Sequence, residues 1–394
     1  MPIKPFAEFA WQRALYCLRT ALASPLGGGR RVRQVSDGKA DLRYLIDSYL
    51  DWTASEPIPV IEGRSVDLYS VATAPWPRLG GGCRAAFAHL RGRGDFLGVQ
   101  IIEIPPGAQT DWLRHLYDEV FYVLAGQGST SIEPSADEPR NFSWGPRALF
   151  APPLNASFRL MNQSRAPGRL LCGNGLPFLM NVFRNEHFLF DHPVDFPRRL
   201  VGPAGSLVPV APGRHLWETG FVPDLGTLPL PEWDARGAGF RNINIVLSDS
   251  SMHAHVSEIP AGTYTKGRRH DTGVHVIGIS GAGYTLIWKE GEGAFERVEL
   301  RPGSLFALPD EALHQHFNSG TEPLRYLGLS VGNERYPVLA RKLKRRAVLD
   351  TSVRDGGLQI EYEDQDLRIH VIWRDAIAMT GAVSRMEHIV EART

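Results

Sequence analysis

Short apolar runs that end at glycine or proline recur along most of the chain. In the first half they cover residues 96–104, 120–124 and 148–151, and a glycine or proline follows each run within two positions. Strands of a β-sandwich or barrel show this length and this regular spacing of turn residues. The pattern therefore predicts an all-β fold from about residue 87 onward.

The same pattern returns in the second half of the chain, at residues 243–259, 274–280 and 303–308. The stretch from Gly107 to Gly126 and the stretch from Gly262 to Gly281 each span 19 positions, and they lie 155 residues apart. Self-similarity at a fixed offset is the signature of a repeated structural unit. We therefore expect two copies of one β unit.

The segments outside the two β units show other patterns. Residues 6–23 and 42–52 carry apolar positions near helical spacing, residues 203–239 are rich in proline and glycine, and residues 336–349 are basic and helix-like. The sequence thus predicts five parts: an N-terminal helical and irregular extension (1–85), a first β unit (86–202), a linker (203–240), a second β unit (241–335) and a C-terminal extension (336–394).

Size and charge narrow the function classes. A chain of 394 residues is too long for one ordinary core, which favours two domains. Lys plus Arg and Asp plus Glu are 43 each, so no broad charged surface for nucleic acid or an anionic membrane is expected. No run approaches the roughly 20 apolar residues of a membrane span. Three cysteines without paired spacing, and no signal peptide, predict reduced thiols and a cytoplasmic location.

Two short histidine clusters stand out in the second β unit. One contains His270 and His275, and the other contains His314, His316 and Asn318. Alternate residues of a strand share one face, so the last three side chains are expected to point the same way. Imidazole is a common ligand of iron, copper, nickel and zinc. The clusters therefore predict a metal site.

These residues resemble the two motifs of the cupin superfamily, and their duplication resembles a bicupin. The second copy keeps seven motif positions in register: Gly262, His270, Gly281, Gly303, Pro309, His314 and Asn318. The resemblance covers roughly residues 87–332. It implies two tandem cupin barrels (double-stranded β-helix or jelly-roll) with the helical N-terminal and C-terminal extensions outside them.

The first copy departs from the cupin pattern. His115 and Glu119 are in register, but Leu113 and Phe158 occupy the other two ligand positions. A stable metal site normally needs three or more protein ligands. We therefore expect this barrel to be metal-free and structural, with His115 and Glu119 as a hydrogen-bonded pair. A ligand-binding pocket in it is the alternative.

The second copy departs at two ligand positions. Arg268 stands at the first histidine position and Val274 at the carboxylate position, one residue before His275. His275 could supply the missing ligand, so the expected metal ligands are His270, His275 and His314.

His316 is expected to be a fourth ligand or an acid/base group, or else to form a hydrogen bond to the barrel wall. Arg268 is expected either to hold a substrate carboxylate or to be a surface arginine beside Arg269. His253 and His255 share one strand face, so they contact the substrate if they point inward. Asn318 completes the expected substrate contacts.

A longer string, residues 252–277, resembles bicupins related to gentisate 1,2-dioxygenases, and residues 217–224 and 356–364 resemble the same group. This resemblance implies a non-haem metal, Fe(II) first and Mn, Ni or Zn as alternatives. It also implies an oxygenase that uses O2 on an aromatic or hydroxy-acid small molecule, in a homodimer. Two alternatives stay open: a non-redox isomerase, lyase or decarboxylase that uses the metal as a Lewis acid, and a non-catalytic small-molecule-binding cupin.

Overall fold

The computed structural model describes residues 46–133, 140–194, 196, 207–211, 215–269, 273–310, 312–338 and 348–386. One compact unit spans Ser48–Thr394, and of the unit Met1–Asp47 only the last two residues are described. The helix expected at residues 6–23, most of the basic segment 336–349 and His270 lie outside the described residues.

The first half of the compact unit forms a large and a small sheet, which we call the N-terminal sandwich. Its strands are β1 (Val60–Gly63), β3 (Ala74–Pro75), β4 (Arg84–Leu90), β5 (Gly98–Ile104), β6 (Glu119–Ala125), β7 (Gly128–Glu133), β8 (Arg140–Trp144), β9 (Leu149–Phe150), β10 (Ser157–Asn162), β11 (Gly168–Asn174) and β14 (Phe221–Val222). The large sheet has the order β1-β4-β5-β11-β6-β9-β14 with β3 paired to β4, and the small sheet has the order β10-β7-β8.

The second half repeats this arrangement as the C-terminal sandwich. Its strands are β2 (Ser65–Asp67), β12 (Val208–Ala211), β13 (Leu216–Thr219), β15 (Arg241–Leu247), β16 (Met252–Ile259), β17 (Thr263–Tyr264), β18 (Gly267–Arg269), β19 (Val274–Ser280), β20 (Gly283–Trp288), β21 (Glu296–Leu300), β22 (Ser304–Leu308), β23 (Leu313–Asn318), β24 (Leu324–Val331) and β25 (Gln359–Ile360). The large sheet has the order β12-β13-β15-β16-β24-β19-β22-β2, and the small sheet has the order β21-β20-β23-β18-β25 with β17 paired to β23.

The duplication predicted from the sequence is confirmed in the backbone. Gly107 and Gly262, 155 residues apart, both have a left-handed backbone, with φ of 66° and 70°. Asn162 and Asn318 end equivalent strands. The Asn162 amide donates to the carbonyls of Ile104, at the end of β5, and Ala166. The Asn318 amide donates to the carbonyls of Ile259, at the end of β16, and Glu322. The predicted all-β fold with two copies of one unit is therefore correct.

The two large sheets pack against each other through one apolar cluster. It takes Ile101, Val120 and Tyr122 from the N-terminal sandwich and Ile277 and Leu329 from the C-terminal sandwich. A sheet covered on both faces needs apolar residues at consecutive positions. This explains why the runs seen in the sequence are nearly continuous in apolar residues and do not alternate.

The segment expected to be a linker contributes strands to both sandwiches. Strand β13 lies parallel to β15 in the C-terminal sandwich, whereas β14 pairs with β9 in the N-terminal sandwich. Conversely, β2 from the N-terminal extension pairs with β22 of the C-terminal sandwich. Each half thus contributes a short strand to a sheet of the other half. The boundaries at 85, 203 and 240 expected from the sequence therefore do not coincide with the limits of the sheets.

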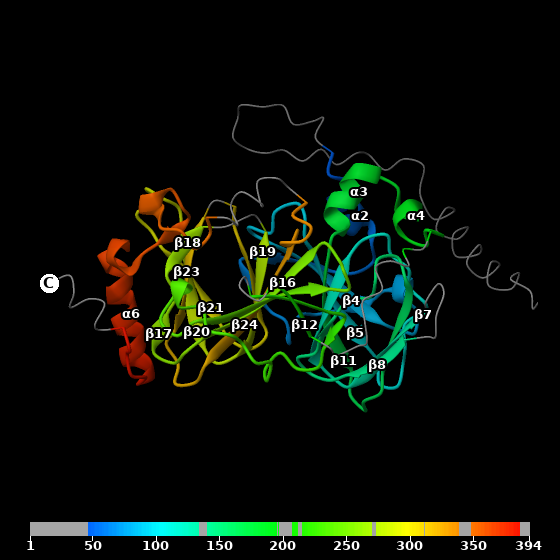
Figure 1. Ribbon diagram of the computed structural model, residues 1–394. Helices are drawn as coiled ribbons and strands as arrows, with labels where there is room; N and C mark the ends of the chain where they lie inside the picture. Colours follow the sequence, from blue (N-terminus) through cyan, green and yellow to red (C-terminus); the bar gives the residue numbers. More distant parts are fainter. Residues whose placement is uncertain are drawn as a thin grey trace, which may run out of the picture. The chain divides into compact units, whose positions relative to one another are not determined.

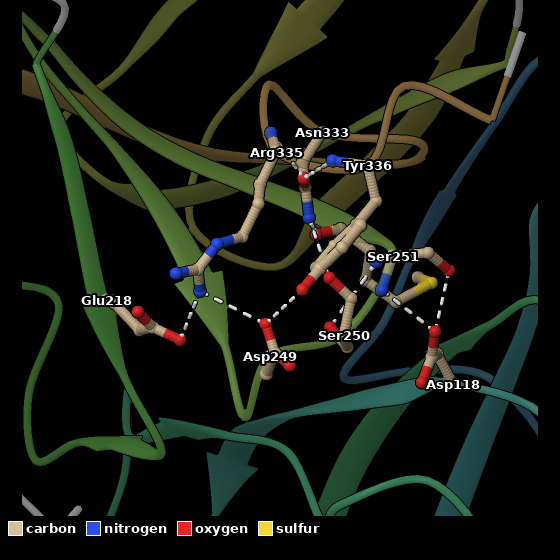
Figure 2. Close-up of polar contacts among 9 residues, drawn as sticks. Asp118, Glu218, Asp249, Ser250, Ser251, Asn333, Arg335 and Tyr336 are labelled. Carbon is tan, nitrogen blue, oxygen red and sulfur yellow. Dashed lines mark hydrogen bonds and ion pairs between the residues drawn. The ribbon is translucent and has the colours of Figure 1, made fainter. Parts of the chain in front are cut away.

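Side-chain bonds also hold the junction together (Figure 2). The Asp118 carboxylate accepts hydrogen bonds from the backbone N–H and the hydroxyl of Ser251, at 2.8 and 2.6 Å. Next to it, the Asn333 amide donates to the carbonyl of Ser250, and Asp249 accepts from Arg335. These contacts fix the turn that leads into β16.

Helices cover the outer surface of the sheets. They are α2 (Ser48–Ser55), α3 (Leu176–Phe183), α4 (Glu186–Leu189) and α6 (Leu367–Thr380). The α6 helix lies beside β17 and β20 (Figure 1), with Trp373 packed on Tyr264 and Phe317. Of the helix expected at residues 42–52, the structure shows α2 from Ser48 onward, and residues 42–45 lie outside the described residues. Among the described residues, none of the helices has the length and apolar character of a membrane span.

Candidate functional site in the C-terminal sandwich

Two imidazoles point into the C-terminal sandwich from β23. The cross-strand partner of His314 is Ile287, which belongs to the apolar cluster inside this sandwich together with Val276 and Tyr326. Side chains of paired residues lie on one face of a sheet, so His314 and His316 both face this interior. They are 1% and 2% exposed, and their ring centroids are 5.3 Å apart. The shared direction expected from strand alternation is confirmed.

Two neighbours fix the ring of His316. Its Nδ1 and the Oγ1 of Thr285 are 2.7 Å apart and share a hydrogen bond. Its ring centroid lies 4.7 Å from that of Tyr326. The bond to the wall of the barrel, one of the two readings of the sequence, is therefore formed, and it orients the imidazole.

Arg268 lies opposite His314 in the ladder between β18 and β23. Its side chain shares the interior face with His314, and the residue is 4% exposed. It forms no hydrogen bond or ion pair with any residue that the structure describes, and its Nε is fully buried without a partner. The next residue, Arg269, faces outward and pairs with Glu290 at 2.7 Å. Arg269 is thus the surface arginine of the pair, and Arg268 is an interior residue.

His275 does not share this interior, which corrects the expected ligand set. Its cross-strand partners are Ala307 and Leu329, and both belong to the apolar cluster between the two sandwiches. Neighbouring residues on a strand face opposite ways, so Val274 points inward and His275 points outward. The Nδ1 of His275 shares a hydrogen bond with the carbonyl of Gly273 at 2.9 Å. Burial is the main cause that lowers the pKa of His275 to about 4.

The other residues expected to contact substrate divide into two groups. His253 and His255 share a hydrogen bond of 3.0 Å, and the His255 ring lies 6.0 Å from Tyr326 in an edge-on arrangement, so this pair reaches the interior. Asn318 instead binds the carbonyls of Ile259 and Glu322, and its oxygen accepts from the N–H of Gly320. The hydrogen bonds of its amide hold a turn, so its role is structural.

The sequence analysis missed several residues of this interior. Arg236 lies in the segment taken for a linker, Tyr326 lies in an apolar run, and Gln359 pairs with Arg268 from the C-terminal extension. The signal for Arg236 was an arginine beside a tryptophan in a proline- and glycine-rich segment, which reads equally well as surface. Only the chain path brings these residues to β18.

The N-terminal sandwich carries apolar side chains at the positions equivalent to Arg268 and His314. Leu113 bridges Phe158 where Arg268 pairs with His314. The expected pair is formed: His115 Nδ1 and Glu119 Oε1 are 2.9 Å apart. The cavity beside this pair is about 10 Å³, roughly the space of one water molecule. Aromatic side chains, among them Tyr117, Phe121 and Phe190, line this small cavity.

The described residues test whether a metal fits the C-terminal interior. Among them, no group of three or more His, Cys, Asp or Glu side chains could hold a metal ion. His314 and His316 supply two imidazoles on one face, and Arg268 opposite His314 adds a positive charge. A set of three imidazoles therefore requires His270, which lies outside the described residues.

No family model matches the chain, and no curated protein matches it. The similar solved structures include a variant of the oxalate decarboxylase of Bacillus subtilis, with a TM-score of 0.45 and 13% identity over 69% of this chain and 78% of that chain. They also include the formate complex of the oxalate decarboxylase of Lactobacillus farciminis, with a TM-score of 0.46 and 14% identity over 69% of this chain and 86% of that chain. Similarity at this level does not bear on substrate or metal. The resemblance to gentisate dioxygenases stays a prediction.

Proposed function

We propose that the protein is a metal-dependent enzyme that acts on a small organic acid inside the C-terminal sandwich. One observation carries the proposal. The interior that is filled by Leu113, Phe158 and Leu160 in one sandwich holds Arg268, His314 and His316 in the other. Burying polar groups costs stability unless they have partners. A duplicate that performs only a structural role can fill these positions with apolar side chains, so we assign the polar set to chemistry.

His270, His314 and His316 are the proposed metal ligands. Thr285 already orients the His316 ring, as ligand imidazoles are commonly oriented by a hydrogen bond at the other nitrogen. His275 is left out because it faces the junction between the sandwiches. A divalent metal at these imidazoles would supply a Lewis acid that polarises an oxygen of the substrate.

The chain's own residues would then bind and orient the acid. Arg268 presents a guanidinium that can donate two parallel hydrogen bonds to a carboxylate. Tyr326 and the pair His253 and His255 border the same interior and are the candidates for moving a proton. The reaction class that needs only these groups is non-redox, such as a decarboxylation or a lyase step.

Metal content of the full-length protein tests this proposal. Protein purified without oxygen and loaded in turn with Fe(II), Mn(II) or Zn(II) should hold a single metal ion per chain, measured by elemental analysis. His314→Ala should lose most of it. His275→Ala is the matched control, because this imidazole is equally buried but faces the other way, and it should keep the metal. Full metal content in His314→Ala would rule out the ligand set.

An oxygenase is the second candidate, and one residue favours it. Val274 occupies the carboxylate position of the motif and packs in the apolar interior, so that position supplies no carboxylate ligand. The proposed ligand set therefore consists of imidazoles alone. The gentisate dioxygenases that the sequence resembles use three histidines and Fe(II). Oxygen uptake with phenolic and hydroxy acids would support this candidate, whereas turnover under nitrogen, or with Zn(II), would support the non-redox reaction.

A further inference from the structure

Arg236 reaches the candidate site from the segment between the two sandwiches. It ends the short turn η4 (Asp234–Arg236), and its carbonyl accepts a hydrogen bond from the N–H of Lys266 at 2.9 Å. Gly237 forms a bridge with Thr265. These backbone contacts place Arg236 beside Lys266, which directly precedes β18. Lys266 is two residues before Arg268 along the chain.

Arg236 is paired with one carboxylate, whereas Arg268 has no ion pair among the described residues. Arg236 Nε donates to Asp350 Oδ1 at 2.7 Å, and its guanidinium lies 4.0 Å from the ring centroid of Trp233. Burial first, and then the charge of Arg268, lower the pKa of Arg236 to about 10. The two side chains therefore lie close enough to repel each other. Asp350 balances one of the two positive charges of Arg236 and Arg268, so the three groups together carry a net charge of +1.

A third donor faces the same space. The Tyr326 hydroxyl is buried and has no hydrogen-bond partner among the described residues. Its phenol contributes to the pKa of Arg236, and its ring centroid lies 4.7 Å from that of His316. The Nε of Arg268 is likewise buried without a partner. Buried donors without partners are rare in folded proteins, so each calls for an acceptor that the described residues do not provide.

We infer that Arg236, Arg268 and the Tyr326 hydroxyl form a binding site for one carboxylate group, and that Asp350 positions Arg236 for this role. The inference deepens the proposed function, on which it rests, by assigning the anchoring end of the substrate. A single carboxylate neutralises the excess charge and offers two acceptor oxygens to the guanidinium groups. In the metal-free site, a phosphate dianion would leave an excess negative charge in the same buried space. Arg236 thus makes the segment between the sandwiches part of the site.

Calorimetric titration of the full-length protein with sodium benzoate tests the inference. Benzamide has the same shape without the charge, and inorganic phosphate has the charge with another geometry, so both should bind at least tenfold more weakly. Arg268→Gln and Arg236→Gln should each weaken benzoate binding at least tenfold, since a lost charged hydrogen bond of about 1.5–3 kcal/mol corresponds to tenfold or more. The double variant should bind benzoate more weakly than either single variant, because the carboxylate then loses both guanidinium donors.

Asp350→Asn should weaken binding less than Arg236→Gln, because it removes only the group that orients Arg236. The control is Arg301→Gln, an exposed arginine paired with Asp67, which should bind benzoate like the wild type. If Arg236→Gln lowers the yield of folded protein, Arg236→Lys keeps the charge without the planar fork and should still weaken binding. Benzoate binding that is unchanged in Arg268→Gln, or equally tight binding of phosphate or benzamide, overturns the inference.

His314→Ala separates this inference from the proposed function. Loss of metal with benzoate binding retained supports the anchor and the ligand set independently. A wild-type protein that binds metal at His314 but not benzoate leaves the proposed function standing and removes the anchor. A protein that binds benzoate but no metal rules out the proposed metal-dependent function and leaves the carboxylate anchor standing.

Discussion

Replacing Arg268 by methionine should stabilise the ligand-free protein, although Arg268 is one of the most buried charged side chains that the structure describes. The residue is 4% exposed and has no ion pair or hydrogen bond among the described residues. A buried charge without a partner opposes folding by several kcal/mol, because its hydration is lost and not replaced. Methionine keeps the length of the apolar stem and removes the charge. The duplicate position, Leu113, already carries an apolar side chain against Phe158.

We expect a gain of about 1–4 kcal/mol in the free energy of unfolding, by analogy with the range found when buried ion pairs are replaced by apolar residues of similar volume. For a chain of 394 residues, with an unfolding entropy of about 2.1 cal/mol/K per residue, that corresponds to a rise in Tm of about 1–5 °C. The variant also relieves Arg236 of a neighbouring positive charge, which adds to the gain.

Urea unfolding followed by tryptophan fluorescence, together with scanning calorimetry, would measure the change. Arg301→Met is the control, because Arg301 is exposed and pairs with Asp67 on the surface, so its loss should change the free energy by no more than about 0.5 kcal/mol. Benzoate at 100 times its Kd should stabilise the wild type by about 2.7 kcal/mol and the variant by much less. A loss of more than about 1 kcal/mol in ligand-free Arg268→Met would refute the reasoning, since it would mean that the guanidinium has a compensating partner.

Three further predictions follow from single side chains. The pKa of His275 is lowered to about 4 in the folded protein, so the unfolded chain binds the proton first as pH falls below about 6.5. The free energy of unfolding should therefore rise with pH between about 4 and 6.5. In urea titrations, His275→Gln should flatten that slope, whereas the control His187→Gln, at an exposed histidine, should not. Asn318→Ala should cost about 1–3 kcal/mol in thermal unfolding, because two carbonyls lose their donor, yet leave benzoate affinity within about twofold; a larger loss of affinity would restore its substrate role. Asp118→Ala should destabilise the junction by about 1.5–3 kcal/mol and increase hydrogen exchange at Ser251, whereas unchanged exchange there would contradict the bond's role.

The sequence by itself determined what depends on local periodicity. The spacing of glycines predicted the duplication, because a positive φ is required at Gly107 and Gly262 to turn between strands. Strand alternation predicted that His314 and His316 share one face, since a strand fixes the direction of every second side chain. The motif register likewise predicted that Leu113 and Phe158 occupy the positions equivalent to Arg268 and His314, and the structure pairs them in the same way.

Tertiary structure decided what depends on partners far along the chain. His275 could be read as a ligand until its pairing with Leu329 showed that it faces the junction. Arg236 had no periodicity to mark it, and only the path of the chain between the sandwiches brings it to Arg268. The exchange of β2 and β14 between the halves is likewise invisible locally, because a short strand finds its sheet through hydrogen bonds to residues more than 70 positions away. Local order fixes which way a side chain can point, and pairing across the fold fixes what it points at.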